Sequence, residues 1–132
     1  MAKVKLFKYN KNFINLFKKE RSEISKLIRN CEIHHVGSTA VPGLGGKGII
    51  DMTVALKNWR QKGEAIKKLK EIGFVHIRPK GREYIFISKK YPTGYKDIHI
   101  HLVKGGNKKD REMLFFRDCL RKDKKEAERY LD

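Results

Sequence analysis

The chain has 132 residues, with 32 Lys and Arg against 15 Asp and Glu, and its formal net charge is +17. This length suits a single domain, expected over residues 1–132, and is long enough to bury a hydrophobic core. Because no apolar run reaches the length of a membrane span and no secretory signal pattern opens the chain, we expect a cytoplasmic protein without membrane contact. The charge favours nucleotides, RNA or other polyanions as partners, although a Lys-rich proteome would produce the same excess.

Hydrophobic patterning predicts an α+β fold, with a mixed or antiparallel sheet of about five strands backed by helices. An amphipathic helix is expected from Phe13 to about Asn30, and Asn58 is expected to cap a second helix that ends before Gly73. The predicted strands are residues 32–36, 49–56, 74–77, 84–88 and 95–103, and further helix is expected over residues 107–122 and 124–132. Turns are predicted at residues 79–81 and 91–94, and the second of them would close a hairpin.

Residues 34–54 join two apolar segments through a glycine-rich loop. Gly37-Ser38 follows a short predicted strand, and such a pair leaves backbone N–H groups and a small hydroxyl open to an anion. Asp51 lies inside the next apolar segment, where a carboxylate is costly unless it binds a cation or a hydrogen-bond donor. A loop suited to phosphate, followed by an acid in a strand, is the layout of metal-assisted phosphoryl or nucleotidyl transfer.

The Gly37-Ser38 pair followed by Asp51 resembles the signature of the nucleotidyltransferase superfamily, which has the polymerase-beta-like fold. The fuller string of residues 35–44, together with Lys47 and residues 49–51, resembles the GrpB family, a branch of that superfamily. Residues 98–101 and 116–121 match the family's His-x-His strand and its Phe-Arg-Asp-x-Leu-Arg helix, so the resemblance covers nearly the whole chain. The second acid of the superfamily pair is replaced here by Thr53.

This resemblance implies that a nucleoside triphosphate binds at the Gly-Ser loop together with a divalent metal ion, Mg²⁺ or Mn²⁺. The expected catalytic residues are Asp51 and Ser38. The expected nucleotide-binding residues are Gly37, Ser38, Thr39, Lys47, His35, Arg82 and Arg117. The side chain of His35 is expected to face the same cleft as the loop, and for both arginines a structural salt bridge is an equally good interpretation.

Successive side chains of a strand point to opposite faces of the sheet, and this alternation along two strands indicates which side chains would hold the metal. Asp51 and Thr53 share one face of their strand, and His99 and His101 share one face of the last strand. In the superfamily a third acid lies on the strand beside the Asp strand, so Asp51, His99 and His101 would converge if the His strand is that neighbour. A carboxylate with imidazoles suits Mn²⁺, Fe²⁺ or Zn²⁺ better than Mg²⁺. Alternatively, the histidines are polar surface residues or bind phosphate directly.

Three functions fit these residues. The first is an active, metal-dependent nucleotidyltransferase with an unknown acceptor, for which RNA is a candidate. The second is a catalytically impaired nucleotide- or RNA-binding module of the same fold, because two-metal transfer normally needs more carboxylates than Thr53 leaves. The third is a hydrolase or different transferase with a one-metal site. We rank them in this order.

Overall fold

The computed structural model describes residues 11–41, 49–89, 97–123 and 125. The helices there are α1 Lys11–Leu27, α2 Lys62–Glu71 and α3 Lys108–Lys122, with short 3₁₀ turns η1 Ser38–Ala40 and η2 Trp59–Gln61. The strands are β1 Cys31–Val36, β2 Ile50–Leu56, β3 His76–Gly81, β4 Tyr84–Lys89 and β5 Ile98–Lys104. None of these helices combines the length and hydropathy needed to cross a membrane.

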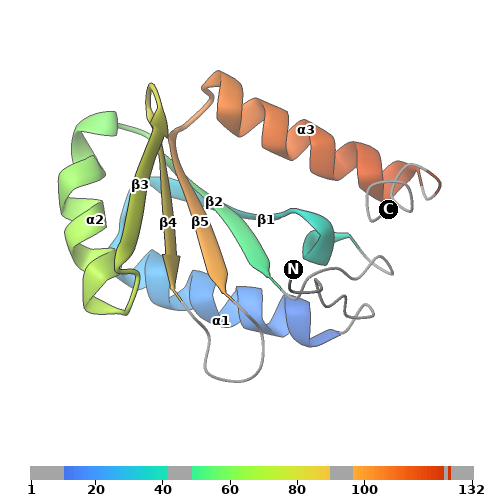
Figure 1. Cartoon of the computed structure of the whole chain (residues 1–132), viewed down its shortest axis with the longest axis horizontal. Helices are drawn as coiled ribbons and strands as arrows, with labels where there is room; N and C mark the ends of the chain where they lie inside the picture. Colours follow the sequence, from blue (N-terminus) through green and yellow to red (C-terminus); the bar gives the residue numbers. More distant parts are fainter. Residues whose placement is uncertain (1–10, 42–48, 90–96, 124, 126–132) are drawn as a thin grey trace, which may run out of the picture.

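The five strands form one mixed sheet in the order β1-β2-β5-β4-β3 (Figure 1). The central strands β2 and β5 are parallel, and every other neighbouring pair is antiparallel. The α+β class and the mixed five-stranded sheet expected from the sequence are therefore confirmed. The parallel pairing of β2 with β5 places the Asp51 strand directly beside the His99 strand.

One face of this sheet is the hydrophobic core. Alternating residues of the central strands point to it, and they are fully buried: Ile50, Met52, Val54, Ile98, Ile100 and Leu102. Helix α1 covers them with Phe13, Phe17 and Ile24, and α2 contributes Ala65 and Leu69. We call this side of the sheet the core face, and the opposite side, which carries Asp51, the site face.

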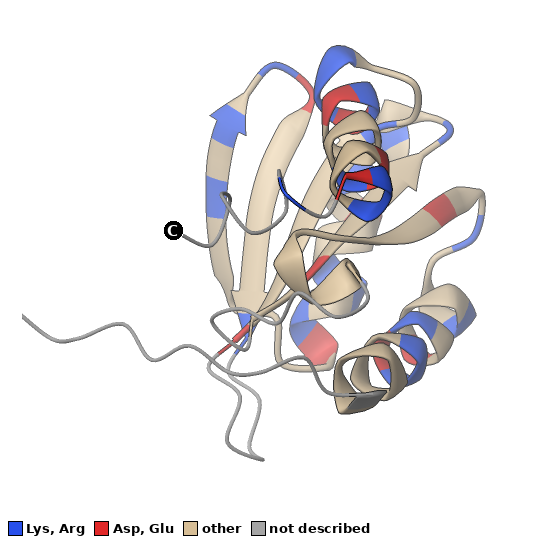
Figure 2. Cartoon of the chain, turned by 90° about the vertical axis from the view of Figure 1, so that its right-hand side faces the viewer, with Lys and Arg blue, Asp and Glu red and all other residues tan. Residues whose placement is uncertain are grey.

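Helix α3 crosses the site face, on the other side of the sheet from α1 (Figures 1 and 2). Asn107 caps its first turn by accepting a hydrogen bond from the Asp110 N–H at 2.9 Å. Near its other end, Arg117 Nη1 donates to the carbonyl of His35 at 3.2 Å and Arg121 Nε donates to the carbonyl of Ala40 at 3.0 Å. These bonds hold α3 against the end of β1 and the turn that follows it.

The main difference from the expected elements lies in the β3–β4 hairpin. The turn predicted at residues 79–81 is wrong, because β3 continues to Gly81 and the chain turns at Arg82 and Glu83 instead. Proline is tolerated in β3 because it is an edge strand, where one side of the backbone has no partner. Strands β4 and β5 pair antiparallel as expected for a hairpin, but the predicted turn at 91–94 lies outside the described residues.

Candidate functional site

The turn after β1 brings the backbone of the loop against Asp51. Gly37 has φ 77° and ψ −174°, a conformation that is essentially restricted to glycine. A Cβ atom at this position would lie 2.9 Å from Asp51 Oδ2. Ser38, which is partly exposed, then opens the turn η1, where the Ala40 N–H donates to the Gly37 carbonyl at 3.2 Å. The glycine therefore allows the close approach of the loop to the carboxylate.

A buried pair, His35 and Thr39, fixes this turn to the start of β2. The Thr39 hydroxyl donates to the Ile49 carbonyl at 3.1 Å, and His35 Nε2 lies 3.0 Å from the Thr39 oxygen. Because the single hydroxyl proton is used on the carbonyl, the imidazole donates through Nε2–H. The Thr39 side chain predicted to contact nucleotide is buried and bonded on both sides, so we assign it to positioning the loop.

The expectation that His35 faces the cleft is wrong. His35 pairs with Met52 in the β1–β2 register, which places its side chain on the core face, and its ring stacks on Phe17 at 4.6 Å. His34 points to the site face instead, opposite Thr53. Burial lowers the pKa of His35 to about 4, so its imidazole is neutral near neutral pH.

This shift predicts that His35 makes the fold sensitive to acid. In the unfolded chain a histidine titrates near pH 6.5, so between that value and about 4 the unfolded state binds a proton that the native state does not. Stability should therefore fall by about 2 kcal/mol between about pH 7 and about pH 5 from this residue. Urea unfolding of wild type and His35→Gln, which can still donate to Thr39, measures the difference in pH slope. Equal slopes in the two proteins would contradict the assignment.

Asp51, His99 and His101 meet on the site face. Asp51 is directly opposite His99 in the parallel β2–β5 register. His101 Nε2 lies 3.2 Å and His99 Nδ1 3.5 Å from the same atom, Asp51 Oδ1. The remaining nitrogens also have partners, since His101 Nδ1 lies 2.8 Å from the Tyr84 hydroxyl and His99 Nε2 lies 3.4 Å from Asp97 Oδ2. The structure thus brings together the three side chains that the sequence singled out.

The electrostatics of this cluster favour a charged Asp51. Burial raises its pKa, but the hydrogen bonds from His101 and His99 outweigh burial and hold the pKa of the carboxyl below its usual value. For His99, burial lowers the pKa, while the bonds to Asp51 and Asp97 outweigh it and leave the pKa raised. His99 therefore carries positive charge more readily than an ordinary histidine, and Asp51 is an anion at neutral pH.

The donor set fits a divalent metal by chemistry, because one carboxylate and two imidazoles are ligands that Mn²⁺, Fe²⁺ and Zn²⁺ accept. Two ligand atoms that each lie about 2.1 Å from an ion, with an angle of about 90° at the ion, are about 3 Å apart. This is close to the 3.2 Å that separates His101 Nε2 from Asp51 Oδ1. In the present arrangement, however, the imidazoles bond to the carboxylate. Among residues 11–41, 49–89, 97–123 and 125, no three His, Cys, Asp or Glu side chains are arranged around a common ion position.

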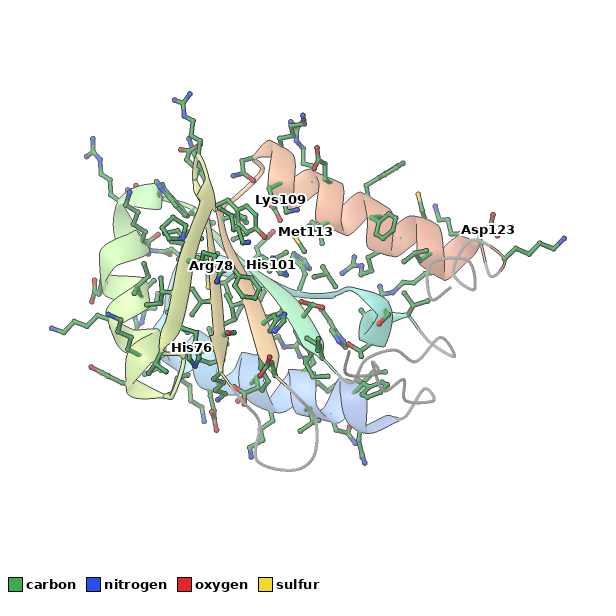
Figure 3. All side chains as sticks on the ribbon, in the orientation of Figure 1. His76, Arg78, His101, Lys109, Met113 and Asp123 are labelled. Carbon is green, nitrogen blue, oxygen red and sulfur yellow. The ribbon has the colours of Figure 1, made fainter. Side chains whose placement is uncertain are left out.

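A pocket of about 530 Å³ opens beside Asp51, between α3 and the site face. Its lining comes from the sheet and its turn (Val36, Gly37, Asp51, His101) and from α3 (Lys109, Glu112, Met113, Phe115, Phe116). Figure 3 shows His101 on the sheet and Lys109 and Met113 on the helix, close to one another. The pocket thus combines two carboxylates, Asp51 and Glu112, and one cation, Lys109, with apolar walls, as small-molecule sites commonly do.

Sequence reasoning missed two residues of this site, Lys109 and Tyr84. The Lys109 ammonium lies 5.2 Å from the centre of the Tyr84 ring, and the Tyr84 hydroxyl bonds to His101 Nδ1. Tyr84 could have been found, because alternation in the predicted strand 84–88 and pairing with the His strand place it on the site face. Lys109 carried no such signal, since its place depends on the path of α3 across the sheet.

The other predicted residues lie elsewhere. Arg82 lines another pocket of about 380 Å³ at the β3–β4 turn, which shares Lys109 and Glu112 with the first. Arg117 pairs with Asp118 at 3.0 Å and bonds to the His35 carbonyl, so the structural interpretation fits it, and phosphate contact stays a prediction. Lys47 lies outside the described residues. Thr53 is fully buried beneath the site face.

Curated relatives of the chain are bacterial proteins named UPF0157. UPF0157 protein YqkA of Bacillus subtilis is 30% identical over 97% of this chain, and UPF0157 protein BH1888 of Halalkalibacterium halodurans is 28% identical over 98% of it. The chain spans 38% of the length of the first relative and 66% of the second. The activities of those whole proteins therefore do not transfer to this chain by similarity alone.

Solved structures with the same fold include a protein of similar sequence and a polymerase. The conserved protein GrpB from Enterococcus faecalis superposes with a TM-score of 0.81 at 24% identity, covering 96% of this chain and 78% of that one. The Cid1 poly(U) polymerase with bound MgGTP superposes with a TM-score of 0.59 at 15% identity, covering 89% of this chain and 40% of that one. The family model described as GrpB protein matches residues 3–132. The chain therefore belongs to the GrpB family and has the nucleotidyltransferase-like fold.

Proposed function

We propose that the chain is a metal-dependent nucleotidyltransferase that binds a nucleoside triphosphate in the pocket beside Asp51. The observation that carries this proposal is the close approach of Gly37 to Asp51 in the lining of that pocket, where a Cβ added to Gly37 would lie 2.9 Å from Asp51 Oδ2. It joins the half-buried Gly37-Ser38 turn to an acid, and phosphate binding beside a metal-binding acid is what phosphoryl chemistry needs. The fold that this chain shares with a MgGTP-bound poly(U) polymerase supports the same assignment.

Each side chain of the site has a role in this proposal. Ser38 and the loop N–H groups bind the β- and γ-phosphates, and Lys109 neutralises charge from the opposite wall. Asp51, with His99 and His101, would hold a divalent cation, Mg²⁺ or Mn²⁺, which when bound neutralises the phosphates. In the transfer, an acceptor hydroxyl oxygen bonds to the α-phosphorus while the bond from that phosphorus to the bridging oxygen breaks; pyrophosphate leaves and the hydroxyl proton passes to water. RNA is the proposed acceptor, since one neighbour of this fold is described as a cytoplasmic RNA terminal U-transferase.

Thr53 favours a second candidate, a nucleotide- or RNA-binding module that has lost transfer chemistry. It stands where the superfamily has its second acid, and its side chain is fully buried. Its hydroxyl has no hydrogen-bond partner among the described residues. A carboxylate at this position would therefore be sealed from solvent, and Thr53 itself supplies no carboxylate for the two-metal arrangement of an active transferase.

Transfer of label separates the two candidates. The full chain is incubated with total RNA, Mn²⁺ or Mg²⁺, and each of the four nucleoside triphosphates labelled at the α-phosphate. We expect incorporation of label from at least one nucleotide by the wild type and none by Asp51→Asn. Glu64→Gln, which removes an exposed carboxylate from α2 on the other side of the sheet, is the matched control and should remain active. Binding of the nucleotide without any incorporation would instead support the second candidate.

A further inference from the structure

The site face continues beyond the pocket to the edge of the sheet. In the β4–β5 and β3–β4 registers, His101 pairs with Phe86, which pairs with Arg78. The neighbouring row runs from Asp51 through His99 and Ser88 to His76 in the same way. Two parallel rows of side chains thus lead from the Asp51 cluster to the edge strand β3, as Figure 3 shows for His101, Arg78 and His76.

The outer part of this surface is basic. His76, Arg78 and Lys80 alternate along β3 and are all exposed. Neither β3 nor β4 contains an Asp or Glu residue. Figure 2 shows the Lys and Arg positions along this edge strand. Arg78 and Lys80 are exposed cations two residues apart on a strand without an acid, and this arrangement suits a chain of phosphates.

The same surface offers an aromatic platform. Phe86 is partly exposed, and its ring meets His99 and His101 edge to face, with centroids 4.8 and 5.6 Å apart. The Lys80 ammonium lies 6.0 Å from the centre of this ring. Aromatic rings beside a basic groove are the features with which proteins bind unpaired bases, because every base has a π-face that can stack.

We propose that this surface, defined by His76, Arg78, Lys80 and Phe86, binds single-stranded nucleic acid and guides its end toward Asp51. The inference rests on the proposed function and names the class of acceptor. Cations on β3 contact phosphates, and a base stacks on Phe86 after Lys80 moves off the ring. A protein strand added to the sheet edge is less suited, since Pro79 lacks the N–H group that such pairing uses.

Fluorescence anisotropy with a short labelled oligonucleotide tests this surface. Single-stranded RNA and DNA of one sequence and the matching duplex are the probes, titrated over a range of salt concentrations. We expect the single strands to bind more tightly than the duplex, because stacking on Phe86 requires unpaired bases. Arg78→Ser combined with Lys80→Ser should reduce the log–log salt slope by about 1.4, since each lost phosphate contact accounts for about 0.7 on single strands.

Two more variants complete the design. Phe86→Leu should weaken single-strand binding by roughly tenfold, with little change in salt slope. Lys67→Ser combined with Lys70→Ser removes the same charge from exposed positions of α2, which covers the core face, and should leave the slope nearly unchanged. Equal losses in both double variants would overturn the proposal, as would equal binding of duplex and single strand.

Nucleotide binding separates failure of this surface from failure of the site. Calorimetry with nucleoside triphosphate and Mn²⁺ should give the same affinity for wild type and for the Arg78 and Lys80 double variant. If nucleotide affinity is retained and the Arg78 and Lys80 double variant binds single-stranded nucleic acid as wild type does, the proposed docking surface is wrong and the proposed function stands. If strand binding depends on Arg78 and Lys80 but no nucleotide binds, the docking surface stands and the proposed function is wrong.

Discussion

Asp51→Asn should abolish nucleotidyl transfer and the stabilisation of the protein by Mn²⁺, while the chain remains folded. The amide has the shape of the carboxylate but neither its charge nor its affinity for a divalent ion. Transfer should fall by more than about a hundredfold, since losing a residue that only orients a metal ligand already costs roughly 10- to 100-fold.

The same substitution should also lower the stability of the metal-free protein. His101 and His99 both bond to Asp51 Oδ1, and these bonds hold the pKa of the carboxyl below its usual value. Hydrogen bonds to charged groups contribute about 1.5–3 kcal/mol, so we expect a loss of about 1–3 kcal/mol. Asp51 is thus expected to be both a ligand and part of the fold.

Thermal melts with and without Mn²⁺ measure both effects. At a concentration about 100 times the dissociation constant, Mn²⁺ stabilises by about 2.7 kcal/mol, which corresponds to a rise of about 10 °C in the melting temperature of a domain of this size. The rise should be present in wild type and in the control Glu64→Gln, and missing in Asp51→Asn. An equal rise in all three proteins would remove Asp51 from the metal site and leave His99 and His101 to explain it.

Gly37→Ala has the second large expected effect, because it combines backbone strain with a collision. The φ of 77° with ψ −174° costs a non-glycine residue about 1–3 kcal/mol. The added Cβ would also lie 2.9 Å from Asp51 Oδ2 and 3.2 Å from its Cβ, so the carboxylate must move. We expect a destabilisation of about 2–4 kcal/mol, and nucleotide binding should be lost even where the protein still folds.

Gly106→Ala is the matched control for this substitution. Gly106 has φ 79°, close to that of Gly37, but a Cβ added there meets no atom within 4 Å. It should cost about 1 kcal/mol and leave nucleotide affinity unchanged. Urea unfolding and calorimetry on both variants separate strain from collision, and similar nucleotide affinities in the two variants would contradict the close-approach argument.

The cluster of Asp51, His99 and His101 could be predicted because strand periodicity alone decides which side chains share a face. The pairing of the two strands came from the superfamily resemblance, and the β2–β5 register agrees with it. The mixed sheet and helices were likewise accessible from apolar spacing. The expected cap residues were only partly right, since Asn58 caps the turn η2 that leads into α2, by accepting from the Arg60 N–H, while Gly73, with φ 99°, follows the end of α2 as expected.

The orientation of His35 could not be predicted in the same way. Periodicity requires His34 and His35 to point to opposite faces, but the register of β1 against β2 decides which one meets the core. Stacking on Phe17 and the bond to Thr39 stabilise His35 inside, and neither is visible in local sequence. The place of Lys109 could not be predicted for a related reason. It depends on how α3 lies across the sheet, and Arg117 and Arg121 hold α3 there through hydrogen bonds to residues about 80 positions earlier in the chain.

Calorimetric titration of the wild-type chain with ATP, GTP, CTP and UTP, each in the presence of excess Mn²⁺, tests the central claim most directly. The nucleotide site beside Gly37, Ser38 and Asp51 predicts saturable binding of at least one triphosphate with a dissociation constant below about 1 mM, equivalent to about −4 kcal/mol. This binding should disappear in Gly37→Ala and persist in Gly106→Ala. Folded wild-type protein that binds none of the four nucleotides more tightly than about 1 mM would contradict the claim.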